Sequence, residues 1–134
     1  MLTQGKQNNK FDVANILRDV LLNDTEVQAI VDNRIYPVIA PEGTKGAFVT
    51  YTRSAYNIDR THMGIYQQTV NIAFACVSRS YDESQRLATA IFNALEGYHS
   101  VKDGQTVVNS CEMMTAEEDY TADAYINYLA FSVK

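Results

Sequence analysis

The sequence predicts an α+β fold with an antiparallel-dominated sheet of about four to five strands, two or three helices packed on one face, and a long β-hairpin arm. Three observations favour this fold. The stretch from Gly64 to Gly97 begins as a long alternating strand and continues directly as a capped amphipathic helix. Helical stretches and an aromatic strand precede it, and two further alternating stretches follow it. Consecutive strands of this kind pair as meanders, and the helices then cover one face of the sheet.

Two helices are predicted near the N-terminus. The stretch from Phe11 to Leu22 carries apolar residues at helical spacing, namely Val13, Ile16, Leu17, Val20 and Leu21. Asn23 followed by Glu26 is a capping pattern, which predicts a second short helix over Asp24–Val31. The preceding sequence MLTQGKQNNK is polar. We therefore expect residues 1–10 to form a flexible tail and residues 11–134 to form a single α+β domain.

The arm is predicted from two strands and the segment between them. Arg34–Pro37 is a brief extended segment, and residues 38–46 contain the second proline and two glycines, which predicts a loop. Ala47–Ser54 is dense in aromatic and β-branched residues and predicts a strand. Ala55–Met63 is polar and has no turn dipeptide of the Asn-Gly kind. The flanking strands are therefore expected to extend into a hairpin arm whose tip lies near Asp59–His62.

The central strand and helix have the strongest local signals. Val70, Ile72, Phe74 and Cys76 fall on one side of the strand, and the smaller, more polar side is formed by Thr69, Asn71, Ala73, Ala75 and Val77. The sequence from Ser80 to Glu83 is a capping box at the start of a helix over Tyr81–Glu96. Gly97 is a natural residue for the left-handed position after that helix.

The C-terminal third is predicted to form two more strands. Tyr98–Asp103 is a connection with Gly104 as its turn, and Gln105–Met114 alternates as a strand. Thr115–Ala122 contains the acidic cluster Glu117-Glu118-Asp119, which is expected in a solvated loop. Asp123–Val133 is nearly apolar on both faces and should be a central or doubly covered strand.

The charge and composition of the chain exclude several classes of partner. The formal net charge is −5, and nine of the acidic residues but only three of the basic residues follow Ser80. Tight sequence-specific nucleic-acid binding needs a basic surface, so we predict no such binding by this chain. DNA can nevertheless pass a negative surface without adhering to it. No apolar run approaches the roughly 20 residues of a membrane helix, so no membrane partner is predicted. The N-terminus lacks the apolar region of a secretory signal, which favours folding in a cytoplasm.

No stretch has the motifs of an enzyme or a metal site. His62 and His99 lie outside catalytic or metal-ligating spacings, and we expect both on the surface. A divalent-ion site at Glu117–Asp119 is a minor alternative to a solvated loop. Cys76 and Cys111 are expected to be buried as small hydrophobic residues, and a disulfide between neighbouring strands is disfavoured in a cytoplasm. We predict no catalytic residues, no cofactor and no metal.

Tyrosine is unusually frequent, with nine residues against five phenylalanines and no tryptophan. Two interpretations have equal weight. Tyrosine has a high strand propensity, and it is also favoured at protein interfaces, where the ring is buried and the hydroxyl stays wet.

The order of these motifs resembles that of a known protein family. The segment Leu21–Val31 followed by Arg34-Ile35-Tyr36-Pro37 is similar to the N-terminal part of the small tail-completion (tail-terminator) proteins of long-tailed bacteriophages and prophages. Val70-Asn71-Ile72 and the capped helix Ser80–Gly97 resemble the later motifs of the same family. The resemblance covers roughly residues 11–133, and its motifs are caps and core positions.

The resemblance implies a structural assembly protein. Such a subunit forms a ring, expected to be a hexamer, that caps the head-proximal end of the tail tube and provides the joint to the head connector. The implied partners are further copies of this chain, the tail-tube protein and the head-connector protein, with DNA passing through the ring lumen. The implied location is the virion, at the head–tail junction, after assembly in the bacterial host cytoplasm. The expected contact residues lie on or beside the arm: Tyr51, Arg53, Tyr56, Asp59, Arg60, His62 and Tyr66.

Two alternatives remain. The second hypothesis is another head–tail joining protein or a minor tail protein. The third is a small ligand-binding module or enzyme, which would require His62, His99 and the acidic stretch to converge in one pocket.

Overall fold

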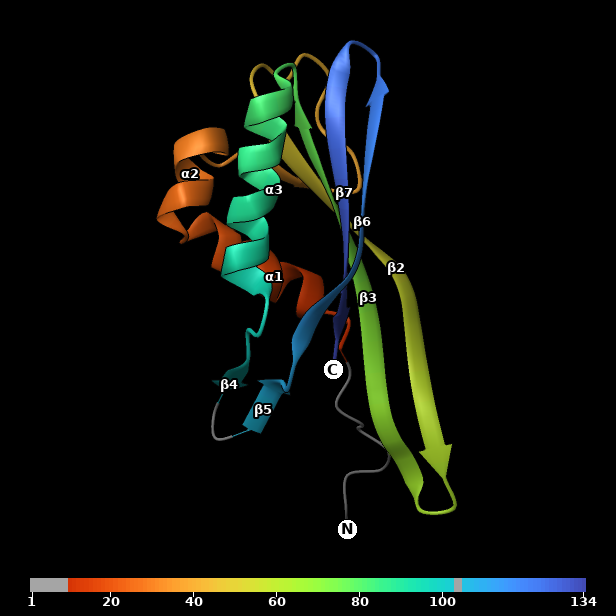
Figure 1. Ribbon diagram of the computed structural model, residues 1–134. Coiled ribbons are helices and arrows are strands. Elements are labelled where there is room, and N and C mark those ends of the chain that lie inside the picture. Colours follow the sequence, from red (N-terminus) through yellow and green to blue (C-terminus); the bar gives the residue numbers. More distant parts are fainter. Residues whose placement is uncertain (1–9, 103–104) are drawn as a thin grey trace.

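The computed structural model describes residues 10–102 and 105–134, and Figure 1 shows its arrangement. The helices are α1 (Val13–Leu22), α2 (Thr25–Val31) and α3 (Tyr81–Leu95). The strands are β1 (Ile35–Pro37), β2 (Phe48–Thr61), β3 (Gly64–Ser78), β4 (Ser100–Lys102), β5 (Gln105–Val108), β6 (Cys111–Thr121) and β7 (Ala124–Val133). The expected N-terminal tail, up to residue 9, and the expected turn at Gly104 lie outside the described residues.

The main sheet confirms the predicted α+β fold. Its five strands run in the order β1-β2-β3-β7-β6. The pairs β2–β3, β3–β7 and β7–β6 are antiparallel, and only the short edge strand β1 lies parallel to its neighbour. β7 is therefore central, as its apolar sequence predicts, because it lies between β3 and the edge strand β6. All three helices lie on one side of this sheet (Figure 1).

The core lies between that sheet face and the helices. Val70, Ile72, Phe74 and Cys76 of β3 are all 0% exposed, which confirms the predicted inward side of this strand. The rings of Phe74 and Phe131 meet edge to face with centroids 5.8 Å apart. The opposite side of β3 is half-buried and faces away from the helices.

The capping box of α3 includes one residue beyond the predicted pair, Ser78, which hydrogen-bonds both Ser80 and Glu83. The Ser80 hydroxyl accepts a hydrogen bond from the Glu83 N–H at 3.4 Å, as the box predicts. The return contact is relayed, because the Ser80 N–H donates to Ser78 Oγ at 3.0 Å and Ser78 Oγ donates to Glu83 Oε1 at 2.6 Å. Ser78 is 2% exposed, so the end of β3 and the start of α3 are joined by a buried hydroxyl. Gly97 follows the helix with φ +78°, as expected for its position.

The predicted cap of α2 is wrong by one residue. Asp24, and not Asn23, is the N-cap, and its carboxylate accepts from the N–H groups of Glu26 and Val27, each at 3.0 Å. The Asn23 amide instead donates to the Asp19 carbonyl at 2.9 Å and closes α1. Because Asn23 already ends the first helix, the first turn of the next helix is capped by the residue that follows it.

The predicted strand over Gln105–Met114 is also wrong. β5 ends at Val108 and pairs with β4 as a separate two-stranded sheet. The chain then bends at Asn109 and Ser110, whose N–H groups donate to the Lys134 carbonyl at 2.6 and 3.2 Å. The C-terminal residue therefore fixes the bend, and no local sequence signal could reveal it.

The acidic stretch is a strand and not the expected loop. Glu117, Glu118 and Asp119 lie in β6 opposite Tyr128, Asn127 and Ile126 of β7. β6 is an edge strand with one open side, so its polar composition reflects exposure and does not prevent pairing. The turn to β7 is formed by Ala122 and Asp123 with φ +51° and +63°, a type I′ geometry without the usual glycine.

The cysteines are buried and unbonded, as predicted. Both are 0% exposed and neither forms a disulfide. Burial raises the pKa of the Cys76 thiol far above its ordinary value and raises the pKa of Cys111 to about 12, with smaller contributions at Cys111 from Glu96 and Glu112.

Thiol reactivity tests this burial. In mildly alkaline buffer the folded chain should not react with a thiol reagent, because reaction requires the thiolate and access to it. In urea both thiols should react at once. A Ser54→Cys variant, which places a thiol at an exposed position, is the control and should react in the folded state. Rapid labelling of the folded natural chain at both cysteines would contradict the packing described above.

Candidate functional site

The arm is the part of β2 and β3 that extends beyond the rest of the sheet, from Ala55 to Val70. The last residue of β7, Val133, lies opposite Val70, so the preceding residues of β3 have no partner in β7. β1 covers β2 only as far as Tyr51. Within the described part of the chain, the strands of the arm therefore pair only with each other along most of its length (Figure 1).

The base of the arm is held by the residues before α1. The rings of Phe11 and Tyr56 lie 4.9 Å apart, and the Arg53 guanidinium carbon lies 4.6 Å from the centroid of the Phe11 ring. The Tyr56 hydroxyl accepts from the Lys10 N–H at 2.8 Å and also hydrogen-bonds Gln68 across the arm. These contacts attach the segment before α1 to the base of the arm.

The tip of the arm is exposed. Asp59, Arg60 and His62 are all on the surface, and the turn consists of His62 and Met63, close to the predicted position. Met63 is 95% exposed. The side chain of Tyr66 lies outside the described residues, so its expected contact role stays a prediction, as do those of Arg53, Tyr56 and the tip residues.

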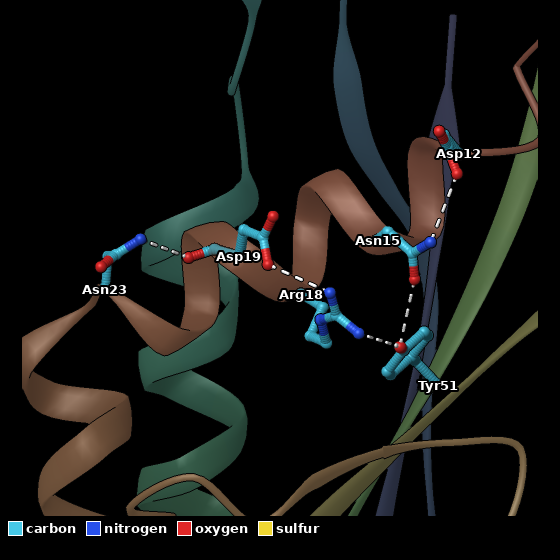
Figure 2. Close-up of polar contacts among 6 residues, drawn as sticks. All are labelled: Asp12, Asn15, Arg18, Asp19, Asn23 and Tyr51. Atoms are coloured by element: carbon cyan, nitrogen blue, oxygen red, sulfur yellow. Dashed lines mark hydrogen bonds and ion pairs between the residues drawn. The ribbon is translucent and has the colours of Figure 1, made fainter.

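Tyr51 belongs to the core. It is 3% exposed, and its ring packs beside that of Phe74 with centroids 6.4 Å apart. Figure 2 shows its hydroxyl against α1, where it lies 3.4 Å from both Arg18 Nη1 and Asn15 Oδ1. Arg18 also pairs with Asp19 at 3.3 Å. Tyr51 has too little free surface to contact a partner directly, and its inclusion among the contact residues is corrected: it attaches α1 to the base of β2.

The sheet face opposite the helices is a surface that sequence reasoning did not identify. No helix of the described chain covers it (Figure 1). Registered pairs place small and apolar residues across it, with Ala73 of β3 next to Ala130 of β7, and Ala75 next to Tyr128. Tyr128 is 39% exposed. The signal was present in the alternation of β3, whose outer side begins with Thr69 and Asn71 but continues with alanine and valine, where a solvated sheet face usually carries charged residues.

An acidic surface lies along the outer end of β6. The Tyr81 hydroxyl donates to Glu118 Oε2 at 2.6 Å, which raises the pKa of Tyr81. The rings of Tyr81 and Tyr120 each lie against Tyr125, and with Glu118 and Asp119 they line a small hollow of about 180 Å³. Among residues 10–102 and 105–134, no group of three or more histidine, cysteine or acidic residues could hold a metal ion.

The residues required by the third hypothesis lie on separate elements. His62 is at the tip of the arm, His99 lies between α3 and β4, and the acidic stretch lies on β6. Neither histidine lines the hollow beside Glu118. The described residues also include no helix long and apolar enough to cross a membrane.

A groove of about 680 Å³ lies at the end of the sheet opposite the arm tip. It is surrounded by the loop before β2, the end of β3, the start of α3 and the β6–β7 turn, with apolar lining from Ala47, Phe48, Val77, Ala124 and Ile126. Three charged residues, Lys45, Arg79 and Glu83, also line it. Lys45 and Arg79 are exposed, and neither forms an ion pair with a residue that the structure describes.

Comparison with known proteins shows a shared fold. No family model matches the sequence, and no curated protein matches it. The structure is similar to one chain of a solved structure described as the virion of a native gene transfer agent (GTA) particle, with a TM-score of 0.70 and 16% sequence identity. The aligned region covers 87% of this chain and 89% of that chain. Two chains of nearly the same extent therefore have the same architecture.

Proposed function

We propose that this chain is a structural protein of a phage-like virion, which caps the head-proximal end of a tail tube as a homo-oligomeric ring and provides the joint to the head connector. The observation that carries the proposal is the arm, which extends beyond β7 and whose two strands pair with no third strand among the described residues. The fold shared with a chain of a gene transfer agent virion supports a role in a virion, and the sequence resemblance to tail-completion proteins supports this position within it.

The arm and the uncovered sheet face are suited to assembly. An unpaired strand edge is a ready template for pairing with another chain. A face that carries alanine, valine and tyrosine can be covered closely by a second protein surface, because small side chains allow backbones to approach. Since these two surfaces are different, contact between copies is heterologous, and such contacts close into rings when the rotation between subunits permits.

The proposed role requires no chemistry from the chain. We infer that it is not an enzyme and that it binds no cofactor. Its partners would be its own copies, the tail-tube protein and the head-connector protein. The acidic residues of β6, Glu117 to Asp119, would discourage DNA from adhering to the ring as it passes through the lumen. The chain would be found in the virion after assembly in the cytoplasm of the bacterial host.

Electron microscopy of particles made with and without this chain tests the proposal. With the chain present, a ring of its copies should be found where the tail meets the head. Without it, tails should have irregular lengths and should not join heads. Normal tail lengths together with a defect elsewhere in the particle would favour the second candidate, another head–tail joining or minor tail protein. Particles that are normal without the chain would overturn both roles.

A further inference from the structure

The arm tip carries an apolar side chain that its own subunit does not cover. Met63 is 95% exposed and occupies the turn between β2 and β3. Its backbone N–H donates to Thr61 Oγ1 at 3.1 Å, which holds the turn in place. Met63 therefore presents an apolar side chain to solvent at the tip of the arm. Methionine is unbranched and flexible, so it fits apolar hollows of irregular shape.

The groove at the other end of the sheet offers such a hollow. Its volume of about 680 Å³ lies within the range of sites that enclose a small ligand, which is large enough for the side chains of a hairpin turn. Phe48 and Val77 lie opposite each other at this end of the β2–β3 pair, whereas Thr61 and Gly64 lie opposite each other at the tip. Tip and groove therefore lie at opposite ends of one hairpin and cannot meet within one subunit.

Both surfaces carry charged residues of each sign, which can pair across a contact. The groove is lined by one carboxylate, Glu83, and by the cations Lys45 and Arg79, which form no ion pair with a described residue. The arm near its tip carries one carboxylate, Asp59, and one guanidinium, Arg60, both exposed. Asp59 can therefore pair with a cation of the groove, and Arg60 can approach the Glu83 carboxylate, which also accepts the hydrogen bond from Ser78 Oγ.

From the apolar tip, the groove and these charges we infer that the arm tip of one copy of this chain, led by Met63, seats in the Lys45–Arg79 groove of the next copy. The inference rests on the ring assembly proposed above and specifies its contact. Each copy has one tip and one groove, so the contact is head to tail, and a closed ring leaves no tip and no groove unused. The groove could instead hold the tail-tube protein or another virion protein, and these are the occupants that the test must distinguish from the arm tip.

Two single substitutions, each with a matched control, test the contact in the full chain. Met63→Arg places a charge on the tip, and Ala124→Arg fills the groove. Met114→Arg and Ala29→Arg make the same changes at exposed positions on β6 and α2, outside both surfaces. Sedimentation velocity measures self-association, and circular dichroism verifies that each variant is folded. We expect the two test variants to self-associate at least about tenfold more weakly than the natural chain, and the controls to match it.

A mixture of the two test variants gives a sharper result. The Ala124→Arg chain keeps an intact tip and the Met63→Arg chain keeps an intact groove, so one contact can form between them and no further one. Each variant alone should therefore sediment as a monomer, and an equimolar mixture should stop at a dimer. Test variants that assemble like the natural chain, or a mixture that stays monomeric or proceeds to full rings, would overturn the inference.

A disulfide measurement separates this contact from the proposed function. In a chain carrying both Met63→Cys and Lys45→Cys, oxidation should join successive copies into a ladder of covalent multimers, and the buried natural cysteines should not contribute. Rings found on tail ends without this disulfide would overturn the contact and leave the proposed function standing. A natural chain that stays monomeric and forms no such disulfide also overturns the contact. Absence of the chain from tail ends would overturn the function itself.

Discussion

Replacing Phe74 with alanine is expected to lower the free energy of unfolding by about 3–5 kcal/mol, which is the usual cost of deleting a fully buried aromatic ring. Phe74 is 0% exposed and lies on the helix-facing side of the sheet, between Tyr51 of β2 and Leu129 of β7. Its ring also meets that of Phe131 edge to face. Because domains are stable by only about 5–15 kcal/mol, this single change should leave the chain close to unfolding. Urea denaturation followed by circular dichroism measures the loss.

Two variants control that measurement. Phe74→Leu keeps much of the buried volume and should cost less than about 2 kcal/mol. Ile39→Ala also truncates an apolar side chain to alanine, but at a loop residue that is 77% exposed, and its effect should stay within about 0.5 kcal/mol. Equal losses for Phe74→Ala and Ile39→Ala would show that Phe74 does not lie at the centre of the core.

Shortening the arm is expected to abolish assembly and leave the fold intact. Replacing residues 59–67 with Asn-Gly would join Ile58 to its registered partner Gln68 through a type I′ turn. Residues from Asp59 to Gly64 are exposed, and among the described residues the removed strand segments pair only with each other. The free energy of unfolding should therefore change by no more than about 1 kcal/mol, within the range of surface changes. Self-association should disappear in sedimentation, and tails made in the presence of this variant alone should not join heads.

The retained residues provide the internal control for the shortened arm. The variant keeps Tyr56, Gln68 and the contacts of Phe11, so the base of the arm is unchanged. A loss of stability comparable to that of Phe74→Ala would mean that the arm supports the fold of its own subunit. Normal assembly of the shortened chain would mean that the arm is dispensable and that the uncovered sheet face alone joins the copies.

Local signals predicted most of the fold because their causes are local. The alternation in β3 and the Ser80 cap of α3 depend on neighbours within a few residues, and both were confirmed apart from the relay through Ser78. The bend at Asn109 was missed because its hydrogen-bond partner, Lys134, follows the last strand, β7, and is far from Asn109 in the sequence. The β6–β7 turn was missed because Ala122 and Asp123 adopt positive φ without glycine.

In the candidate site, too, features with a local cause could be predicted and features formed by distant segments could not. The arm could be predicted from two strands joined by a polar segment without a turn dipeptide, and its exposed tip lies near the predicted position. Tyr51 was misplaced because alternation alone does not say which side of a strand meets α1. The groove had no sequence signal, since it is assembled from four segments that include Lys45, Val77, Glu83 and Ala124.

The sequence by itself determined the fold class, the helices, the central strands and the existence of the arm, because apolar periodicity, caps and strand propensity act over short distances along the chain. Only the tertiary structure decided which surfaces remain open. Whether Met63 is covered, whether the outer side of β3 has a helix against it, and whether the ends of four elements enclose a groove depend on how distant segments meet. Those open surfaces are the ones on which an assembly role depends.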